Sequence, residues 1–182
     1  EDGVSATGAS EIVATLPTIG MAWGTDGNAF ADIAYQYFGN RTGETPVIDK
    51  VGKPCQQNYV IVISDGHIRN STEAFRTLAK LRDEYEVTTL MVGYGGSYQN
   101  ANAKVIFDRL ARAGSCESPG DYYANVNPIS YEGLDNKTGC ESPIDAETPA
   151  DLKTEISSKI RQIIAERLSF TAPSITATLE EG

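Results

Sequence analysis

The stretch Asn58-Tyr-Val-Ile-Val-Ile-Ser-Asp65-Gly66 decides the fold that this sequence predicts. Its apolar centre is rich in β-branched residues and ends abruptly at Ser-Asp-Gly. A run of this length and composition is typical of a strand that is buried on both faces in the middle of a parallel sheet. Open α/β sheets bind their ligands at the carboxyl ends of such strands. We therefore expect any functional site of this chain to include Asp65.

Two amphipathic segments flank this strand. Residues 26–38 are expected to form a helix that Asp26 or Asn28 caps. Residues 70–85 are expected to form another, because Asn70-Ser-Thr-Glu73 resembles a capping box. The apolar residues on one face of the first helix are Phe30, Ile33, Ala34, Tyr37 and Phe38. Those of the second helix are Ala74, Phe75, Leu78, Leu81 and Tyr85.

The rest of the chain continues the alternation of strands and helices. Residues 87–93 predict a second buried strand, and residues 102–113 a helix that Gly114 ends. Residues 122–124 are a short candidate strand, and a cap, a Pro and an acid at 148–151 predict a last helix to about Leu168. Its predicted buried residues are Leu152, Ile156, Ile160, Ile163, Ile164 and Leu168. The order predicts right-handed βαβ units and a doubly wound, mainly parallel α/β sheet covered on both faces.

Length and charge limit the classes of function. The 182 residues suffice for one domain with a core, and the formal net charge is -10 with a pI of about 4.5. No basic stripe is present to neutralise phosphates, so we expect no nucleic-acid partner and no binding to an anionic membrane surface. No apolar stretch approaches transmembrane length, so we expect no direct membrane insertion.

The cysteines allow one disulfide. Cys116 and Cys140 flank a loop rich in Gly, Pro and Asn, and a bond between them would stabilise the chain by about 3 kcal/mol. Cys55 is then left without a partner. The alternative is three unpaired thiols of a cytosolic protein. None of the three forms a zinc motif with His67, the only histidine.

Asp65 is the best candidate ligand for a metal. Hard cations such as Mg²⁺ and Ca²⁺ take carboxylate oxygens. The alternative is a turn aspartate, with Gly66 supplying the special backbone angles. Gly93-Tyr-Gly95-Gly96 is expected to be a tight loop rather than a dinucleotide site, because Tyr98 stands at the third glycine position. His67 lacks a recognisable nucleophile, and no Gly-x-Ser-x-Gly occurs.

The ordered set of these motifs resembles the second half of a von Willebrand factor A domain. In that family the fourth strand ends in Thr/Ser-Asp-Gly, as residues 57–66 do, and the fifth ends in a Gly-x-Gly loop, as residues 87–95 do. Leu110-Ala-Arg-Ala-Gly114, Asp121-Tyr-Tyr-Ala124 and residues 151–168 match the following helix, strand and last helix. The resemblance implies a Rossmann-like A domain.

Three further segments are similar to the PilY/PilC-type tip proteins of type IV pili. They are Pro54-Cys-Gln-Gln-Asn-Tyr59, the helix at 26–38, and Phe170-Thr-Ala-Pro-Ser-Ile-Thr176, and the resemblance covers roughly residues 25–178. It implies a secreted or cell-surface, pilus-associated protein with roles in adhesion and pilus biogenesis. The implied partners are a host or surface protein ligand and pilin or minor pilins.

The chain departs from the family pattern at the metal site. The family takes ligands from an Asp-x-Ser-x-Ser motif, a Thr, and the Asp after the fourth strand. The motif is absent here, Asn28 stands at the Thr position, and Asp65 alone transfers cleanly. Asp65 and Asn28 are thus the predicted ligands of Mg²⁺ or Ca²⁺, and no cofactor is expected to be required. This chain alone is expected to bind the metal weakly or not at all, unless a separate polypeptide or an omitted segment completes the site.

The departures also suggest an incomplete domain. The opening residues are too few for the first strands and helix of an A domain, so we expect an excised piece whose missing N-terminal part is a further partner. Residues 1–25 are expected to be a loop-rich leader and 171–182 a linker toward a following domain. Residues 26–170 are the predicted partial A domain, with an insert at about 125–147.

Three functions follow, in order of preference. The first is a non-enzymatic adhesion and assembly module that captures an acidic group of a partner through a divalent cation. The second is a structural A-like scaffold with a degenerate metal site, which Asn28 favours. The third is an α/β hydrolase that uses Asp65 and His67.

Overall fold

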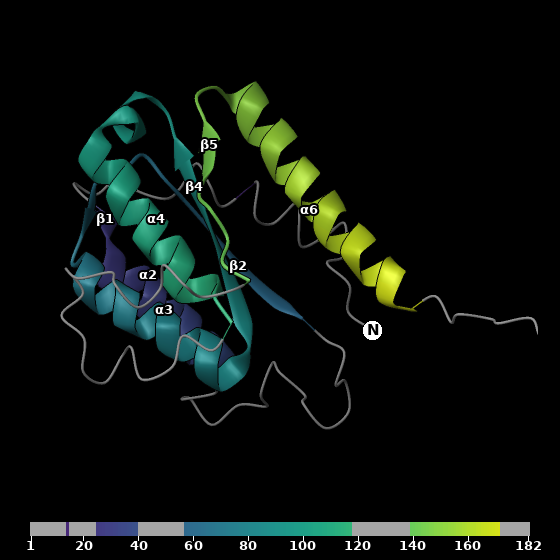
Figure 1. Ribbon diagram of the computed structural model, residues 1–182. Helices are drawn as coiled ribbons and strands as arrows, with labels where there is room; N and C mark the ends of the chain where they lie inside the picture. The colour runs from purple at the N-terminus through teal and green to yellow at the C-terminus, as the bar shows by residue number, and fades with distance from the viewer. Residues whose placement is uncertain (1–13, 15–24, 40–56, 118–138, 172–182) are drawn as a thin grey trace, which may run out of the picture.

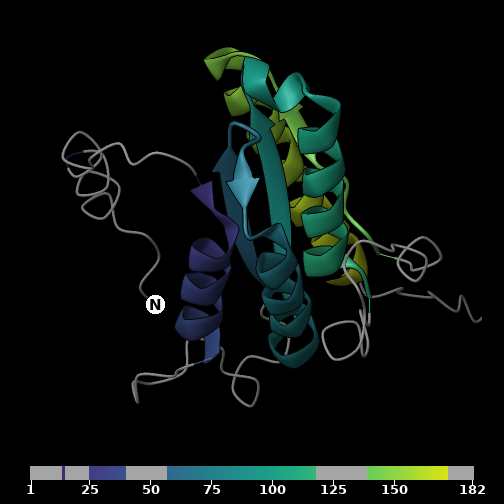
Figure 2. The ribbon, with the colours of Figure 1, turned by 90° about the vertical axis from the view of Figure 1, so that its left-hand side faces the viewer.

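The chain folds into an α/β structure in which a parallel sheet has helices on both faces. The computed structural model describes residues 14, 25–39, 57–117 and 139–171, with side chains of the last helix up to residue 165. Helices α2, α3 and α4 lie on one face of the sheet and α6 on the other (Figures 1 and 2). The strands are β1 (Thr25–Asp26), β2 (Asn58–Ser64), β3 (Ile68–Arg69), β4 (Val87–Tyr94) and β5 (Ile144–Ala146). The helices are α2 (Gly27–Gly39), α3 (Ser71–Tyr85), the 3-10 helix η2 (Gly96–Gln99), α4 (Ala101–Ser115) and α6 (Pro149–Thr171). The predicted α/β class with parallel strands and flanking helices is confirmed.

The sheet has the strand order β2-β4-β5, and all pairings are parallel. Asn58 lies opposite Val87, and the register continues to Ser64 opposite Gly93. Helices α3 and α4 connect successive strands of this sheet on the same face, as in βαβ units. The strands β1 and β3 form a separate parallel pair, which leads into the starts of α2 and α3.

The prediction that residues 58–64 form a strand is confirmed, but the prediction that both of its faces are buried is wrong. In the described residues β2 is an edge strand, and Ile61 and Ile63 are 41% and 50% exposed. The fully covered strand is β4, where Leu90 and Val92 are 3% and 0% exposed. The apolar run of β2 gave no sign of this, because burial depends on neighbours that the run itself does not encode.

The third strand of the sheet comes from an unexpected segment. Residues 144–146 fall within the predicted insert, yet they pair with β4 from Val92 to Tyr94. The predicted strand at 122–124 lies outside the described residues. A run of three residues is too short for periodicity to identify it as a strand.

The core lies between the sheet and helices α2, α3 and α4. The buried face predicted for residues 70–85 is confirmed at Ala74, Phe75, Leu78 and Leu81. Gly114 does not end its helix, contrary to the prediction, because α4 continues to Ser115. A Cβ atom at Gly114 would lie 2.5 Å from Cβ of Thr89, so this glycine instead allows α4 to pack closely against β4.

The face predicted to be buried on residues 26–38 is partly wrong. Ile33 and Tyr37 are 68% and 61% exposed, whereas Ala31, Ala34 and Phe38 are buried. The helix has apolar residues on most of its circumference, so the pattern did not distinguish the side that packs against α3.

The start of α6 is as predicted, but its apolar row is not buried. The Thr148 hydroxyl accepts a hydrogen bond from the Asp151 N–H at 3.2 Å, and Asp151 accepts one from the Thr148 N–H at 2.9 Å. The predicted buried residues are half-buried at Leu152, Ile156 and Ile163 and exposed at Ile160 and Ile164, while the side chain of Leu168 lies outside the described part. Helix α6 packs chiefly against the short strand β5, which covers too little of the helix to bury the row.

A disulfide joins Cys116, which follows α4, to Cys140, which precedes β5. This is the predicted pairing. Ser115 reinforces the junction, because its hydroxyl donates to the Ala111 carbonyl at 2.6 Å and accepts from the Glu141 N–H at 2.7 Å. Glu141 in turn pairs with Lys159 of α6 at 2.5 Å. The segment that carries β5 and α6 is thus covalently attached to the helices of the opposite face.

Candidate functional site

The predicted site lies at the carboxyl edge of the sheet, where β2 ends in Ser64 and is followed by Asp65. The turn after β2 requires glycine, because Gly66 has a φ of 107°. A Cβ atom at Gly66 would also lie 2.9 Å from Cα of Tyr98. The Ser-Asp-Gly sequence therefore fixes a tight turn that leaves the side chain of Asp65 exposed to solvent.

Asp65 forms a hydrogen bond within its own turn. Its Oδ1 accepts from the backbone N–H of His67 at 3.5 Å, the pattern of an Asx turn. Among the described residues its carboxylate has no other hydrogen-bond partner. This contact is the one that the turn alternative predicts, and it leaves Oδ2 free to bind a ligand.

Asn28 belongs to a different group of polar residues at the start of α2. The carboxylate of Asp26 accepts from the Asn28 N–H at 3.0 Å and from Nδ2 of Asn70 at 3.1 Å. Asn28 donates through its own Nδ2 to Asp32 at 3.1 Å. Of the two predicted caps, Asp26 is therefore the residue that caps α2.

Asn70 was misinterpreted from the sequence. It has a left-handed backbone with a φ of 53°, and its side chain forms no capping bond with α3. Its amide instead donates to Asp26, which ties the start of α3 to the start of α2. The Ser/Thr/Asx-x-x-Glu pattern does not distinguish these arrangements, since the alternative partner lies far away in the sequence.

The short pair of β1 and β3 separates the two predicted metal ligands. Asp65 precedes β3 and Asn28 follows β1, and no hydrogen bond joins their side chains. In the described ranges, no three His, Cys, Asp or Glu side chains lie close enough to hold a metal ion. A role of Asp65 and Asn28 as ligands of Mg²⁺ or Ca²⁺ stays a prediction.

The loop after β4 is held by β5. The Gly95 N–H donates to the Ala146 carbonyl at 3.0 Å, and the Asp145 carboxylate accepts from Gln99 at 3.1 Å and from Lys104 at 3.0 Å. The ring of Tyr98 fills the space above Gly93, where a Cβ atom would lie 2.3 Å from the ring. The tyrosine at the third glycine position of the motif thus packs inside the loop.

Tyr98 is also a titratable residue, and its pKa is raised in the folded chain. Burial raises the pKa of the Tyr98 hydroxyl, and the negative charges of Asp145 and Asp108 raise it further. His67 is exposed, and its ring contacts no hydrogen-bond partner in the described part of the chain.

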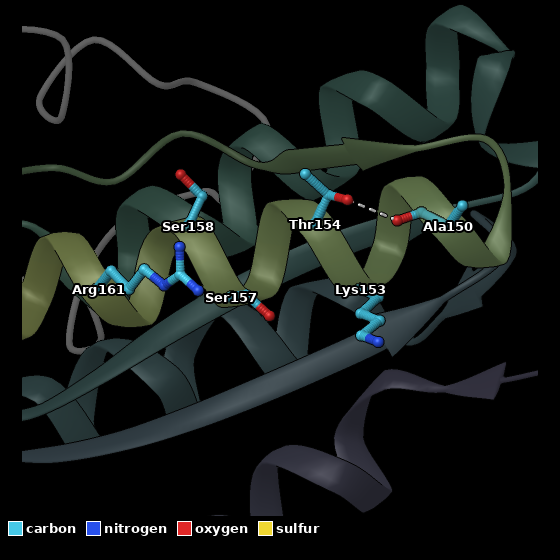
Figure 3. A pocket seen from close by; sticks show the side chains of 6 residues that line it. All are labelled: Ala150, Lys153, Thr154, Ser157, Ser158 and Arg161. Carbon is cyan, nitrogen blue, oxygen red and sulfur yellow. Dashed lines mark hydrogen bonds between the residues drawn. The ribbon is translucent and has the colours of Figure 1, made fainter.

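A cavity of about 600 Å³ lies along α6, away from both predicted ligands. Figure 3 shows the described residues that line it, which are Ala150, Lys153, Thr154, Ser157, Ser158 and Arg161. Thr154 donates its hydroxyl to the Ala150 carbonyl at 2.9 Å. The lining residues include the two cations Lys153 and Arg161, although most of the lining area is apolar. All of them belong to one exposed helix, so the described residues provide one wall only.

No family model, curated protein or solved structure gives a significant match to this chain. Within the described residues, each helix is too short or too polar to span a lipid bilayer.

Proposed function

We propose that the chain is a non-enzymatic adhesion and assembly module, of the A-domain type that its sequence resembles in PilY/PilC-type pilus tip proteins. Its mechanism is capture of an acidic group of a partner through a divalent cation, Mg²⁺ or Ca²⁺, held at the carboxyl edge of the sheet. The proposed setting is the cell surface, with a host or surface protein as ligand and pilin or minor pilins as assembly partners.

The observation that carries this proposal is the exposed Asp65 carboxylate at the carboxyl end of a parallel strand. Ligands of open α/β sheets bind at this edge, and hard cations prefer such oxygens. Its single described hydrogen bond comes from a backbone N–H to Oδ1, so binding a cation at Oδ2 breaks no side-chain pair.

Isothermal titration with MgCl₂, CaCl₂ and MnCl₂ tests the cation. We expect weak binding heat in the wild-type chain, which Asp65→Ala abolishes and Glu155→Ala retains, because Glu155 is an exposed carboxylate on α6, away from the proposed site. Asn28→Thr, which introduces the residue of the family pattern, is expected to tighten binding. Heat that survives Asp65→Ala unchanged would exclude Asp65 as a ligand.

A scaffold domain without a working metal site is the second candidate, and one contact favours it. The Asn28 amide donates to Asp32, so its side chain already belongs to a local network. For a scaffold domain we expect no binding heat with MgCl₂, CaCl₂ or MnCl₂ and no shift of the melting temperature when these cations are added. The two candidates therefore give opposite results in the same experiment.

A further inference from the structure

We infer that Asp145 of β5 is a positioning residue for the turn that carries Asp65, although the two residues lie far apart in the sequence. Asp145 acts through residues 95–99, which we call the η2 loop, and this loop contacts the turn at Gly66. The inference rests on the proposed function, because it concerns the carboxylate that would hold the cation. It adds that β5 controls how this carboxylate is presented.

The turn after β2 packs directly against the backbone of the η2 loop. Gly66 is buried, and a Cβ atom there would lie 2.9 Å from Cα of Tyr98 and 3.1 Å from the carbonyl oxygen of Ser97. On its α4 side the same atom would lie 3.0 Å from Cβ of Ala103. Because no side chain of Gly66 cushions these contacts, a shift of the η2 loop must move the turn or leave a gap beneath it.

The carboxylate of Asp145 holds the η2 loop from the side of β5. Its Oδ1 accepts a hydrogen bond from Nε2 of Gln99 at 3.1 Å, and its Oδ2 accepts one from Nζ of Lys104 at 3.0 Å. Gln99 is the last residue of the loop, and Lys104 lies in the first turn of α4. The two oxygens of one planar carboxylate thus fix the end of the loop relative to the helix that follows it.

The strand β5 also holds the beginning of the η2 loop. It lies beside the end of β4, with Tyr94 opposite Ala146 (Figure 1). The Gly95 N–H then donates to the Ala146 carbonyl at 3.0 Å. Two successive residues of β5, Asp145 and Ala146, therefore clamp the loop at its two ends.

The centre of the η2 loop is anchored independently of Asp145. The ring of Tyr98 packs against Phe107 with the ring centroids 4.8 Å apart, and it fills the space above Gly93. This buried contact remains when the Asp145 carboxylate is removed. Loss of the carboxylate is therefore expected to shift the loop without unfolding it.

The strength of the clamp limits the size of the effect. The side chains of Lys104 and Asp145 are 43% and 44% exposed, and an exposed ion pair contributes little to stability. A contact of this strength can change an equilibrium by no more than about fivefold. A positioning role therefore predicts a local change at Asp65 together with nearly unchanged overall stability.

Backbone NMR of the cation-free chain tests the positioning directly. In Asp145→Ala we expect the amide signals of Gly66 and His67 to shift and their order parameters to fall from about 0.85 toward about 0.6. Asp108→Ala is the matched control, because the Asp108 side chain is also 44% exposed and its ion pair with Arg112 stays within α4. We expect the control to leave both amides unchanged and the two variants to melt alike.

NMR titration with MgCl₂ and CaCl₂ then measures the consequence for binding. Asp145→Ala is expected to weaken the cation affinity about twofold to fivefold, whereas Asp108→Ala removes the same charge and is expected to keep it. Asp145→Glu retains the charge and both acceptor oxygens, so it is expected to restore most of the affinity and the wild-type signals of the turn.

Three results would overturn the inference. The first is a turn whose amide signals and order parameters are unchanged in Asp145→Ala. The second is an equal change in Asp108→Ala, which would trace the effect to the lost charge rather than to the clamp. The third is a turn that moves while the cation affinity stays at the wild-type value, because Asp145 would then not position the ligand oxygen.

The same measurements separate this inference from the cation proposal. A turn that moves in Asp145→Ala, in a chain whose wild type binds neither cation, would reject the cation proposal and retain the positioning of the turn. Cation binding that depends on Asp65 but not on Asp145 would retain the cation proposal and reject the role of Asp145.

Discussion

The two faces of the sheet differ sharply in how completely they are covered. On one face α2, α3 and α4 enclose a continuous core in which Leu78, Phe107 and Met91 are fully buried. On the other face α6 packs chiefly on the three residues of β5 and leaves Ile160 and Ile164 exposed. Helices α3 and α4 thus bury the apolar residues that face the core, whereas α6 leaves part of its own apolar row exposed.

This difference shows that an amphipathic pattern predicts a helix but not whether another element packs over its apolar face. Residues 102–113 and 149–168 both carry apolar residues at helical spacing, and both form helices. Only α4 has a strand and a neighbouring helix along its length, so only its apolar row is buried. Burial is a property of the pair of elements that meet, whereas periodicity belongs to one of them.

The largest expected effect comes from deleting a side chain on the covered face. Leu78→Ala removes a fully buried side chain of α3 and is expected to lower the free energy of unfolding by about 2–5 kcal/mol. Ile63→Ala is the matched change on the open face and is expected to cost less than about 1.5 kcal/mol, since half of Ile63 is exposed. Urea denaturation followed by circular dichroism measures both. Equal losses would remove the contrast between the faces.

The disulfide is expected to have the next largest effect on stability, because it joins α4, on one face of the sheet, to the segment that carries β5 and α6. Replacing Cys116 and Cys140 by Ser together should lower stability by about 3 kcal/mol, since the bond closes a loop of 24 residues. Hydrogen exchange should increase most at β5 and the start of α6, which the bond holds to α4. An increase spread evenly over β4 and α3 would show that the segment is not a separate unit.

The smallest expected effect is a fall in the free energy of unfolding at alkaline pH. It arises from Tyr98, which lies in the loop between β4 and α4. Because the pKa of Tyr98 is raised in the folded chain, the unfolded chain loses this proton first as the pH rises past 10.0. The stability that this group contributes is therefore complete below that pH and is lost as the pH rises through the folded pKa. Tyr98→Phe keeps the ring against Phe107 but cannot titrate.

Urea denaturation between pH 8 and pH 11.5 checks this sign, with Tyr98→Phe as the control. We expect the free energy of unfolding of the wild type to fall more steeply at alkaline pH than that of the variant. Parallel curves would mean that Tyr98 titrates alike in both states.

The candidate site was predicted from the sequence only in part. Asp65 follows a strand in the sequence as it does in the structure, because a turn of Ser-Asp-Gly is a local feature. The bond from Asn70 to Asp26 joins residues 44 positions apart, so no local pattern could reveal it. The same holds for Asp145, which lies in a segment without periodicity and accepts bonds from Gln99 and Lys104.

The sequence by itself determined the α/β class, the strands at 58–64 and 87–93 and the helices. These follow from local spacing, β-branched composition and turn residues. The tertiary structure alone decided that β2 is an edge, that β5 joins the sheet from an apparent insert, and that Ile33 and Ile160 stay exposed. Local interactions select the conformation of a segment, but its burial depends on which distant segments come to lie against it.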